Sequence, residues 1–427
     1  MKSPPLSEKP KVFYGYWIVM ATFFCLFIAA GCGFFAFSLF VKPLQADLGW
    51  GRGEIMAAFT IFYLVAGVAS PFIGRVVDRY GARRVIFIGA LIAGLGFVLL
   101  SLVSNLWHFH VSYAIIGVGM TAIGHVPSSA IVSNWFKKRR GTAIGIMSTG
   151  IGVGGVALAP LVGGYLIPNF GWRFSYLVLA ALTWVLIIPL ALLVIKTKPA
   201  DMGLYPDGKQ APEAMAVTEA SPLAVKGITL QMALTTSAFW LIAVSFLTGL
   251  FSQVGILQHQ VPYLEDIGFP VAMAAGALGV VGLMSAIGKF GFGWLCDQIP
   301  AKYAWSIGLG FQAVGIIILI SVEPASPPAI VWLYAIMIGL GAGSWLPTMS
   351  VLISTNFGLA AYGAIFGAVA LFENTGTATG PLMAGYMYDA MGNYYWAFII
   401  LLALHAVALL TALMVRHPKS LRNFKEE

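Results

Sequence analysis

The sequence predicts an all-α integral membrane protein with twelve transmembrane helices in two six-helix, pseudo-symmetric bundles. Three observations predict this fold. Apolar residues make up 59% of the 427-residue chain and charged residues only 9%, long apolar runs recur along the chain, and the second half repeats the first. Soluble domains average about 45–50% apolar and about 25% charged residues, so the composition excludes a soluble enzyme. The unbroken runs also exclude a membrane β-barrel, whose strands alternate.

Twelve runs are long enough to cross a bilayer, which takes ~20 apolar residues. They lie at 14–41, 54–74, 84–104, 108–133, 141–166 and 173–196, and then at 234–258, 271–294, 303–322, 328–354, 361–387 and 394–415. We therefore expect an N-terminal six-helix bundle over 1–196, a cytoplasmic linker over 197–232, and a C-terminal six-helix bundle over 233–427. Pro127, Pro160, Pro347 and Pro381 predict kinks in the fourth, fifth, tenth and eleventh spans.

The basic residues predict how the chain lies in the membrane, because short cytoplasmic loops are enriched in Lys and Arg. Most of them fall on one side of the predicted topology, in the loops between spans 2 and 3 and between spans 4 and 5, and at both termini. We expect a multi-pass protein of the cytoplasmic (inner) membrane with both termini cytoplasmic. Topology explains the net charge of +8, so no nucleic acid partner is expected. The residues are Arg75, Arg79, Arg83, Arg84, Lys137, Lys138, Arg139, Arg140, Lys2, Lys9, Lys11, Arg416, Lys419, Arg422 and Lys425.

An internal repeat relates the two halves. Gly74 and Asp78 recur as Gly293 and Asp297, and Asn134 recurs as Asn356 at nearly the same offset along the chain. Two halves repeated in the same orientation are one of the ways in which secondary transporters are built, with the substrate site between the halves near the bilayer midplane. The repeat therefore predicts a substrate site at the interface between the bundles.

The loop between spans 2 and 3 resembles the signature of the major facilitator superfamily. It reads Gly74-Arg75-Val76-Val77-Asp78-Arg79-Tyr80-Gly81-Ala82-Arg83-Arg84. Asp78 can face the positive end of a neighbouring helix and pair with an adjacent arginine, so Asp78, Arg79, Arg83 and Asp297 are candidate gating residues. The second copy has Gln298 where Arg79 stands, which argues against a symmetric contact in the second half.

Further motifs resemble the monocarboxylate transporter branch, which is similar to the oxalate–formate antiporters. They include Tyr14-Gly15-Tyr16-Trp17 and Gln258-His259-Gln260-Val261-Pro262-Tyr263. The resemblance implies transport of a small organic anion, a lactate-type monocarboxylate, together with protons.

Three ionisable residues lie deep inside predicted spans, where a charge costs at least ~2.5–3.5 kcal/mol and so marks a functional site. Lys289 lies ~12 Å and Glu373 ~16 Å from the cytoplasmic ends of their helices, at ~1.5 Å per residue. His125 lies at a similar depth. They come from different helices, so the sequence predicts a polar site at the midplane.

Lys289 occupies the position where the resemblance implies an arginine that binds the substrate carboxylate. Compared with arginine, lysine keeps the positive charge but loses the two-pronged donor geometry. In the alternative interpretation, Lys289 snorkels toward the cytoplasm or pairs with Asp297. Glu373 is a candidate proton carrier whose ionisation alternates with anion binding at Lys289. The alternatives are a packing carboxyl bonded to Asn or Thr across the interface, and a counter-ion for a cationic substrate.

The remaining candidate site residues are less specific. His125 is a candidate proton relay or a packed histidine, and His259 a candidate for the external gate. Tyr63, Gln253, Trp345 and Asn374 are expected to line the cavity, as are Cys32, Phe35, Thr121 and Ser252.

These observations lead to one main functional hypothesis. The protein is expected to move a small organic anion by rocker-switch alternating access, driven by protons. The alternatives are an anion exchanger of the oxalate–formate type and a carrier of neutral or cationic compounds. No catalytic triad, metal cluster or Walker sequence is seen, so we expect no enzyme activity, no cofactor, no metal and no ATP.

Overall fold

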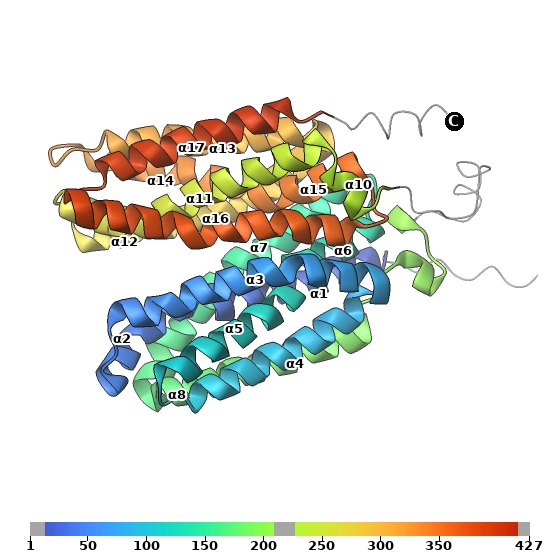
Figure 1. The fold of residues 1–427 in the computed structure, drawn as a ribbon, viewed down its shortest axis with the longest axis horizontal. Coiled ribbons are helices and arrows are strands. Elements are labelled where there is room, and N and C mark those ends of the chain that lie inside the picture. Colours follow the sequence, from blue (N-terminus) through green and yellow to red (C-terminus); the bar gives the residue numbers. More distant parts are fainter. Residues whose placement is uncertain (1–12, 209–226, 417–427) are drawn as a thin grey trace, which may run out of the picture.

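The computed structural model describes residues 13–208 and 227–416. These residues are helical apart from loops and one isolated bridge between Gly227 and Gly358 (Figure 1). The first bundle contains six spans: α1 (Gly15–Ala30) with η1 (Gly31–Phe35) and α2 (Phe37–Leu48); α3 (Arg52–Tyr80); α4 (Ala82–Ser101); α5 (Leu106–Ile123) with α6 (His125–Trp135); α7 (Arg140–Ala159) with η2 (Pro160–Leu166); and α8 (Ile167–Pro189) with η3 (Leu190–Val194). Gly171, with φ of 78°, lies inside α8 and separates the sixth span from the fifth, so the first residues of α8 belong to the fifth span.

The second bundle repeats this order. It contains α11 (Ser237–Asp266), α12 (Val271–Gln298), α13 (Ala301–Ile320), α14 (Pro328–Ala342) with α15 (Trp345–Phe357), α16 (Tyr362–Met391) and α17 (Tyr395–Met414). Within the described residues the predicted all-α fold of twelve spans in two bundles is therefore confirmed.

Short helices lie between the bundles: η4 (Pro199–Met202), η5 (Pro206–Gly208) and α10 (Leu230–Leu234). Part of the predicted linker, 209–226, lies outside the described residues, as do the terminal charges Lys2, Lys9, Lys11, Lys419, Arg422 and Lys425. The described start of the linker is bound to the first bundle, because the Trp135 indole N–H donates to the Lys196 carbonyl at 2.9 Å and Asp207 accepts the backbone N–H groups of Lys137 and Lys138, each at 3.0 Å.

The fourth and tenth spans are broken at equivalent places. The breaks lie at Gly124 and at Gly343–Ser344, and Pro127 and Pro347 are each the third residue of the helix that follows. Proline is tolerated in a first helical turn, where its missing N–H has no intrahelical acceptor. The prolines therefore mark new helix starts just after each break, and these starts are His125 and Trp345.

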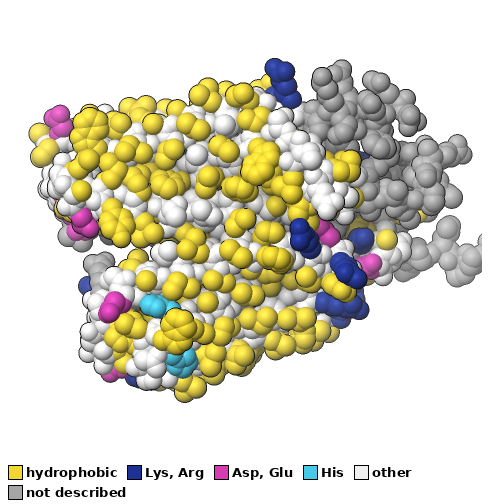
Figure 2. Space-filling view, viewed as in Figure 1, with side chains coloured by type: hydrophobic (Ala, Val, Ile, Leu, Met, Phe, Trp, Pro, Cys, Tyr) yellow, Lys and Arg dark blue, Asp and Glu magenta, His cyan; other side chains and the backbone are white. Residues whose placement is uncertain are grey.

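The surface matches a membrane protein with one basic end. Figure 2 shows hydrophobic side chains over the long face of the molecule and Lys and Arg gathered toward one end, here called the basic end. The basic end is formed by the α3–α4 and α6–α7 loops. Large apolar side chains exposed along the helices include Leu95, Val185, Leu283 and Leu410.

The two bundles pack together most tightly toward the basic end, where α3 lies against α16 and α7 against α12 (Figure 1). There, Phe292 and Ile365 of the second bundle belong to the same buried core as the first bundle. Toward the opposite end, the second bundle has a separate core that includes Leu264, Ile316 and Phe398. The bundles thus share a core at the basic end but keep separate cores at the opposite end.

Candidate functional site

Asp78 joins the two bundles at the basic end. Its carboxylate accepts the backbone N–H groups of Gly363 and Ala364, both at 2.8 Å, in the first turn of α16. A helix N-terminus carries unsatisfied N–H groups and a partial positive charge, so a carboxylate is favoured there. Gly74 permits this approach, because a Cβ atom at that position would overlap the Gly363 carbonyl oxygen.

Asp297 makes the matching contact in the second half. Its carboxylate accepts the backbone N–H groups of Gly141 at 2.7 Å and Thr142 at 2.8 Å, and the Thr142 hydroxyl at 2.6 Å, at the start of α7. The expectation that Gln298 argues against a symmetric contact is therefore wrong. The contact needs only the carboxylate and the backbone amides of a helix start, and the residue after Asp297 takes no part in it.

Within residues 13–208 and 227–416, no arginine forms the predicted ion pair with Asp78. The ion pairs among the described residues are His125–Glu373 and Arg173–Asp47. Arg83 instead donates to the Leu192 carbonyl at 2.5 Å. Arg79 lies over the Tyr80 ring at 5.2 Å and lines a cavity with Asp78.

We expect Asp78→Asn and Asp297→Asn each to weaken closure of the basic end. Each loses charge-assisted hydrogen bonds worth about 1.5–3 kcal/mol, so the open state should gain ~10- to 150-fold in population. The rate at which a maleimide labels a cysteine introduced at Ser350, near this interface, measures opening. Asp389→Asn, an exposed site at the opposite end, is the control; labelling no faster than in Asp389→Asn would contradict the prediction.

Lys289 is a buried cation in α12. It is 3% exposed, and its Nζ donates to the Ser285 hydroxyl at 2.6 Å, one turn toward the opposite end. Its backbone lies at the interface between the bundles, because a Cβ atom on Gly145 of α7 would lie 2.7 Å from the Lys289 carbonyl oxygen. The amine thus points away from the basic end and from Asp297. This orientation does not match the alternative in which Lys289 snorkels toward the cytoplasm or pairs with Asp297.

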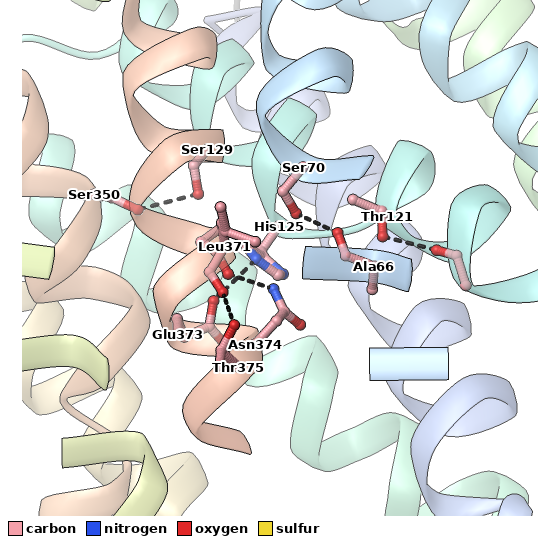
Figure 3. A network of polar contacts seen from close by, with 12 residues as sticks. Ala66, Ser70, Thr121, His125, Ser129, Ser350, Leu371, Glu373, Asn374 and Thr375 are labelled. Atoms are coloured by element: carbon pink, nitrogen blue, oxygen red, sulfur yellow. Dashed lines mark hydrogen bonds and ion pairs between the residues drawn. The ribbon is translucent and has the colours of Figure 1, made fainter. Parts of the chain in front are cut away.

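Glu373 pairs with His125 across the bundle interface, as Figure 3 shows. The His125 Nε2 atom of α6 lies 3.3 Å from Oε2 of Glu373 in α16. Neither atom makes a hydrogen bond to another described residue. The structure therefore brings Glu373 to His125, where sequence reasoning coupled it to Lys289.

Aromatic and polar residues surround this pair. Trp345 meets the His125 ring edge to face, with ring centroids 5.7 Å apart. Tyr63 packs on Phe59 and lies within electrostatic range of Glu373. The Asn374 amide donates to its own helix, to the Ala370 carbonyl at 2.7 Å (Figure 3).

His259 occupies a bonded position in the second bundle. One ring nitrogen, Nε2, lies 2.9 Å from the Pro381 carbonyl, and Nδ1 lies 3.2 Å from the Tyr394 hydroxyl. A carbonyl can only accept, so Nε2 carries a hydrogen. Nδ1 is then free to accept the hydrogen of the Tyr394 hydroxyl. These contacts tie α11 to α16.

Gln253 and Ser252 are buried in α11. The Gln253 Oε1 atom and the Ser252 hydroxyl make no hydrogen bond to any residue in the described ranges. Over the same ranges, no group of three His, Cys, Asp or Glu side chains is placed to hold a metal ion.

Sequence reasoning missed three residues at the bundle interface. Phe366 contacts the His125 ring, with centroids 5.8 Å apart, and the Ser350 hydroxyl donates to Ser129 at 3.0 Å (Figure 3). The two serines lie on α6 and α15, which are equivalent helices of the two halves, so the repeat could have suggested where these helices meet. Phe366 carries no such signal.

Known proteins similar to this chain are membrane transporters. The family model described as Major Facilitator Superfamily matches residues 22–376. Monocarboxylate transporter 13 of Rattus norvegicus is 26% identical over 398 residues, covering 92% of this chain and 87% of the relative. Monocarboxylate transporter 11 of Homo sapiens is 29% identical over 345 residues, covering 79% and 69%.

Solved structures show the same fold. The E. coli fucose:proton symporter FucP aligns with a TM-score of 0.70 at 16% identity, covering 95% of this chain and all of the other. The human organic anion transporter MFSD10 aligns with a TM-score of 0.71 at 15% identity, covering 96% and 100%. The matched family model, the twelve spans and the related transporters agree, and the chain is a multi-pass membrane transporter that belongs to the major facilitator superfamily.

Proposed function

We propose that this protein is a secondary active transporter that carries a small monocarboxylate together with a proton across the cytoplasmic membrane. The single observation that carries the proposal is the buried Lys289 ammonium at the bundle interface. Its one described hydrogen-bond partner is a neutral hydroxyl, and a buried charge is costly until it is paired. An anionic substrate would supply the missing partner, and the names of the related monocarboxylate transporters support this substrate class.

Transport follows from movement of the bundles. Residues 1–196 and 233–427 act as two units joined by the 197–232 linker, and the basic end faces the cytoplasm, in line with its Lys and Arg content. The Asp78 and Asp297 contacts hold the basic end closed, and the proposed cycle assigns this closed basic end to the state that accepts substrate from the outside. Substrate enters there, and opening of the basic end releases it inside.

The pairing of Glu373 with His125 favours an anionic over a cationic substrate. A counter-ion for a cation needs a free carboxylate, whereas Glu373 lies 3.3 Å from an imidazole. Gln253, Ser252, Tyr63, Trp345 and Asn374 are the neutral residues proposed to complete the cavity, and His259 is proposed to support its outer side.

The proposal is tested with purified protein and proteoliposomes. A thermal-shift screen against monocarboxylates, dicarboxylates, neutral sugars and organic cations should show stabilisation by monocarboxylates, because a ligand of the folded state stabilises it. An inward proton gradient should then drive accumulation of the stabilising acid. Stabilisation by cations alone, or uptake indifferent to the gradient, would contradict the proposal.

A further inference from the structure

The His125–Glu373 pair connects the two moving bundles near the middle of the protein. His125 is the first residue of α6 in the first bundle, and its ring lies among Trp345, Phe366 and Glu373, which all belong to the second bundle. A side chain of one bundle is thus held by a pocket of the other. Any separation of α6 from α16 must pull the pair apart.

The two partners differ in access to solvent. The His125 side chain is 19% exposed and the Glu373 side chain 6% exposed, so a proton reaches the imidazole more readily than the carboxyl. His125 is therefore the better proton acceptor of the two.

Few other titratable groups face this pair. From α3, Tyr63 lies within electrostatic range of Glu373, and Asp78 is bound to the start of α16. From α11, His259 is bound to the Pro381 carbonyl, and from α17, His405 is buried within the second bundle. Helices α10 and α15 carry no titratable side chain. From α16 itself, Tyr362 is buried and packs on Phe366. Among the described residues, Lys289 is the remaining buried charge.

We propose, resting on the proposed function, that His125 accepts the coupled proton and that Glu373 holds the resulting imidazolium across the bundle interface. The buried charges then sum to zero in both forms of the carrier, empty and loaded, that must change between the outward-facing and inward-facing conformations. In the empty carrier, neutral His125, ionised Glu373 and protonated Lys289 sum to zero. In the loaded carrier, the His125 imidazolium, Glu373 carboxylate, Lys289 ammonium and substrate carboxylate also sum to zero. Because a net buried charge is disfavoured, one proton accompanies one anion.

The movement of the bundles determines on which side of the membrane the proton is taken up and on which side it is released. On the outside, water donates a proton to the neutral imidazole, and the imidazolium pairs with Glu373. When the basic end opens, α6 and α16 separate and the imidazolium loses its counter-ion. The proton then passes to water on the cytoplasmic side, and the anion follows because Lys289 is again balanced by Glu373.

The test is the pH dependence of anion affinity between pH 6 and 8, with the monocarboxylate that stabilises the protein most as the probe. Such acids, with a carboxyl pKa of ~4, stay ionised throughout. One linked proton makes the wild-type dissociation constant rise about tenfold per pH unit above the titration midpoint. His125→Gln should flatten this dependence to less than twofold per unit, whereas the control His108→Gln, at a half-exposed histidine, should keep it.

For the Glu373→Gln variant, the expected change is a rise in anion affinity. Without the carboxylate, Lys289 has an unbalanced charge even when His125 is neutral, so affinity at pH 8 should rise to near the wild-type value at pH 6. A merely structural role for Glu373 would lower affinity instead. In proteoliposomes this variant should keep anion exchange but lose proton-driven net uptake.

The outcomes separate the two proposals. If the wild type binds no monocarboxylate at any pH, the proposed function fails. If it binds one and His125→Gln keeps the full pH dependence, or Glu373→Gln binds more weakly at pH 8, the assignment of the proton to His125 fails while the transporter assignment stands.

Discussion

Replacing Lys289 by Gln is expected to abolish high-affinity monocarboxylate binding and uptake. The amine is buried and hydrogen-bonded to Ser285 of its own helix, whose backbone packs against α7 at the bundle interface, so an anion beside it gains a charge-assisted hydrogen bond in a low-dielectric site. Removing one partner of such a buried charge pair costs about 2–5 kcal/mol, which weakens binding at least ~30-fold. Glutamine is one atom shorter but keeps a hydrogen-bond donor, so the change mainly removes the charge.

Two further variants sharpen this test. Lys289→Arg keeps the charge and adds a planar fork, so it should retain binding and change the preference among carboxylates. Lys42→Gln removes an exposed lysine at the opposite end and should bind as the wild type does. Uptake and calorimetric binding of the stabilising monocarboxylate give the readout, and unchanged uptake of every carboxylate by Lys289→Gln would remove the anion hypothesis.

The sequence was sufficient to predict the fold because a bilayer imposes long apolar runs and the repeat divides them into two sets. Even α16, which carries the polar segment from Glu373 to Thr377, was found, because its flanks are apolar and its glycines recur. The kinks of the fourth and tenth spans were placed close to the breaks, since Pro127 and Pro347 mark the first turn of the following helix. Pro160 begins the π-helical segment η2, whereas Pro381 lies inside the unbroken helix α16, so no helix break accompanies that proline.

The sequence predicted how deep the site residues lie in the membrane, but it did not predict which of them contact one another. The regular rise of an α-helix, ~1.5 Å per residue, placed Lys289, Glu373 and His125 at one level. Which of them meet depends on the rotation and position of each helix, and twelve helices of similar hydrophobicity leave both open. Glu373 consequently was coupled to Lys289 in the sequence-based hypothesis, although its contact is His125.

The sequence-based predictions also missed contacts in which a side chain binds a backbone amide or carbonyl group. Asp297 binds the amides of Gly141 and Thr142, and His259 binds the carbonyl of Pro381. Amides and carbonyls are present all along the chain, so no side-chain pattern reveals them. A helix start brought near a carboxylate by packing is visible only once the helices are placed.

The largest effect on the transport cycle is expected from Gly293→Val. A Cβ atom at Gly293 would lie 2.6 Å from both the Gly141 carbonyl oxygen and the Gly145 Cα atom, and both are backbone atoms that cannot rotate away. The valine must therefore push α12 from α7, which also separates Asp297 from its amides. Overpacking costs about 1–3 kcal/mol, which with the lost contact of about 1.5–3 kcal/mol should raise the population of the open basic end at least ~70-fold over the wild type.

Gly291→Val is the matched control, because a Cβ atom at Gly291 of the same helix would have nothing within 4 Å. Both variants add the same side chain to α12, so helix propensity cancels in the comparison. Labelling of a cysteine introduced at Ser350 should accelerate in Gly293→Val alone, and its net uptake should fall at least tenfold because the outward-open state is rarely reached. Equal labelling and uptake in the two variants would show that the α7–α12 contact does not close the basic end, and the Asp297 contact would then have only a structural role.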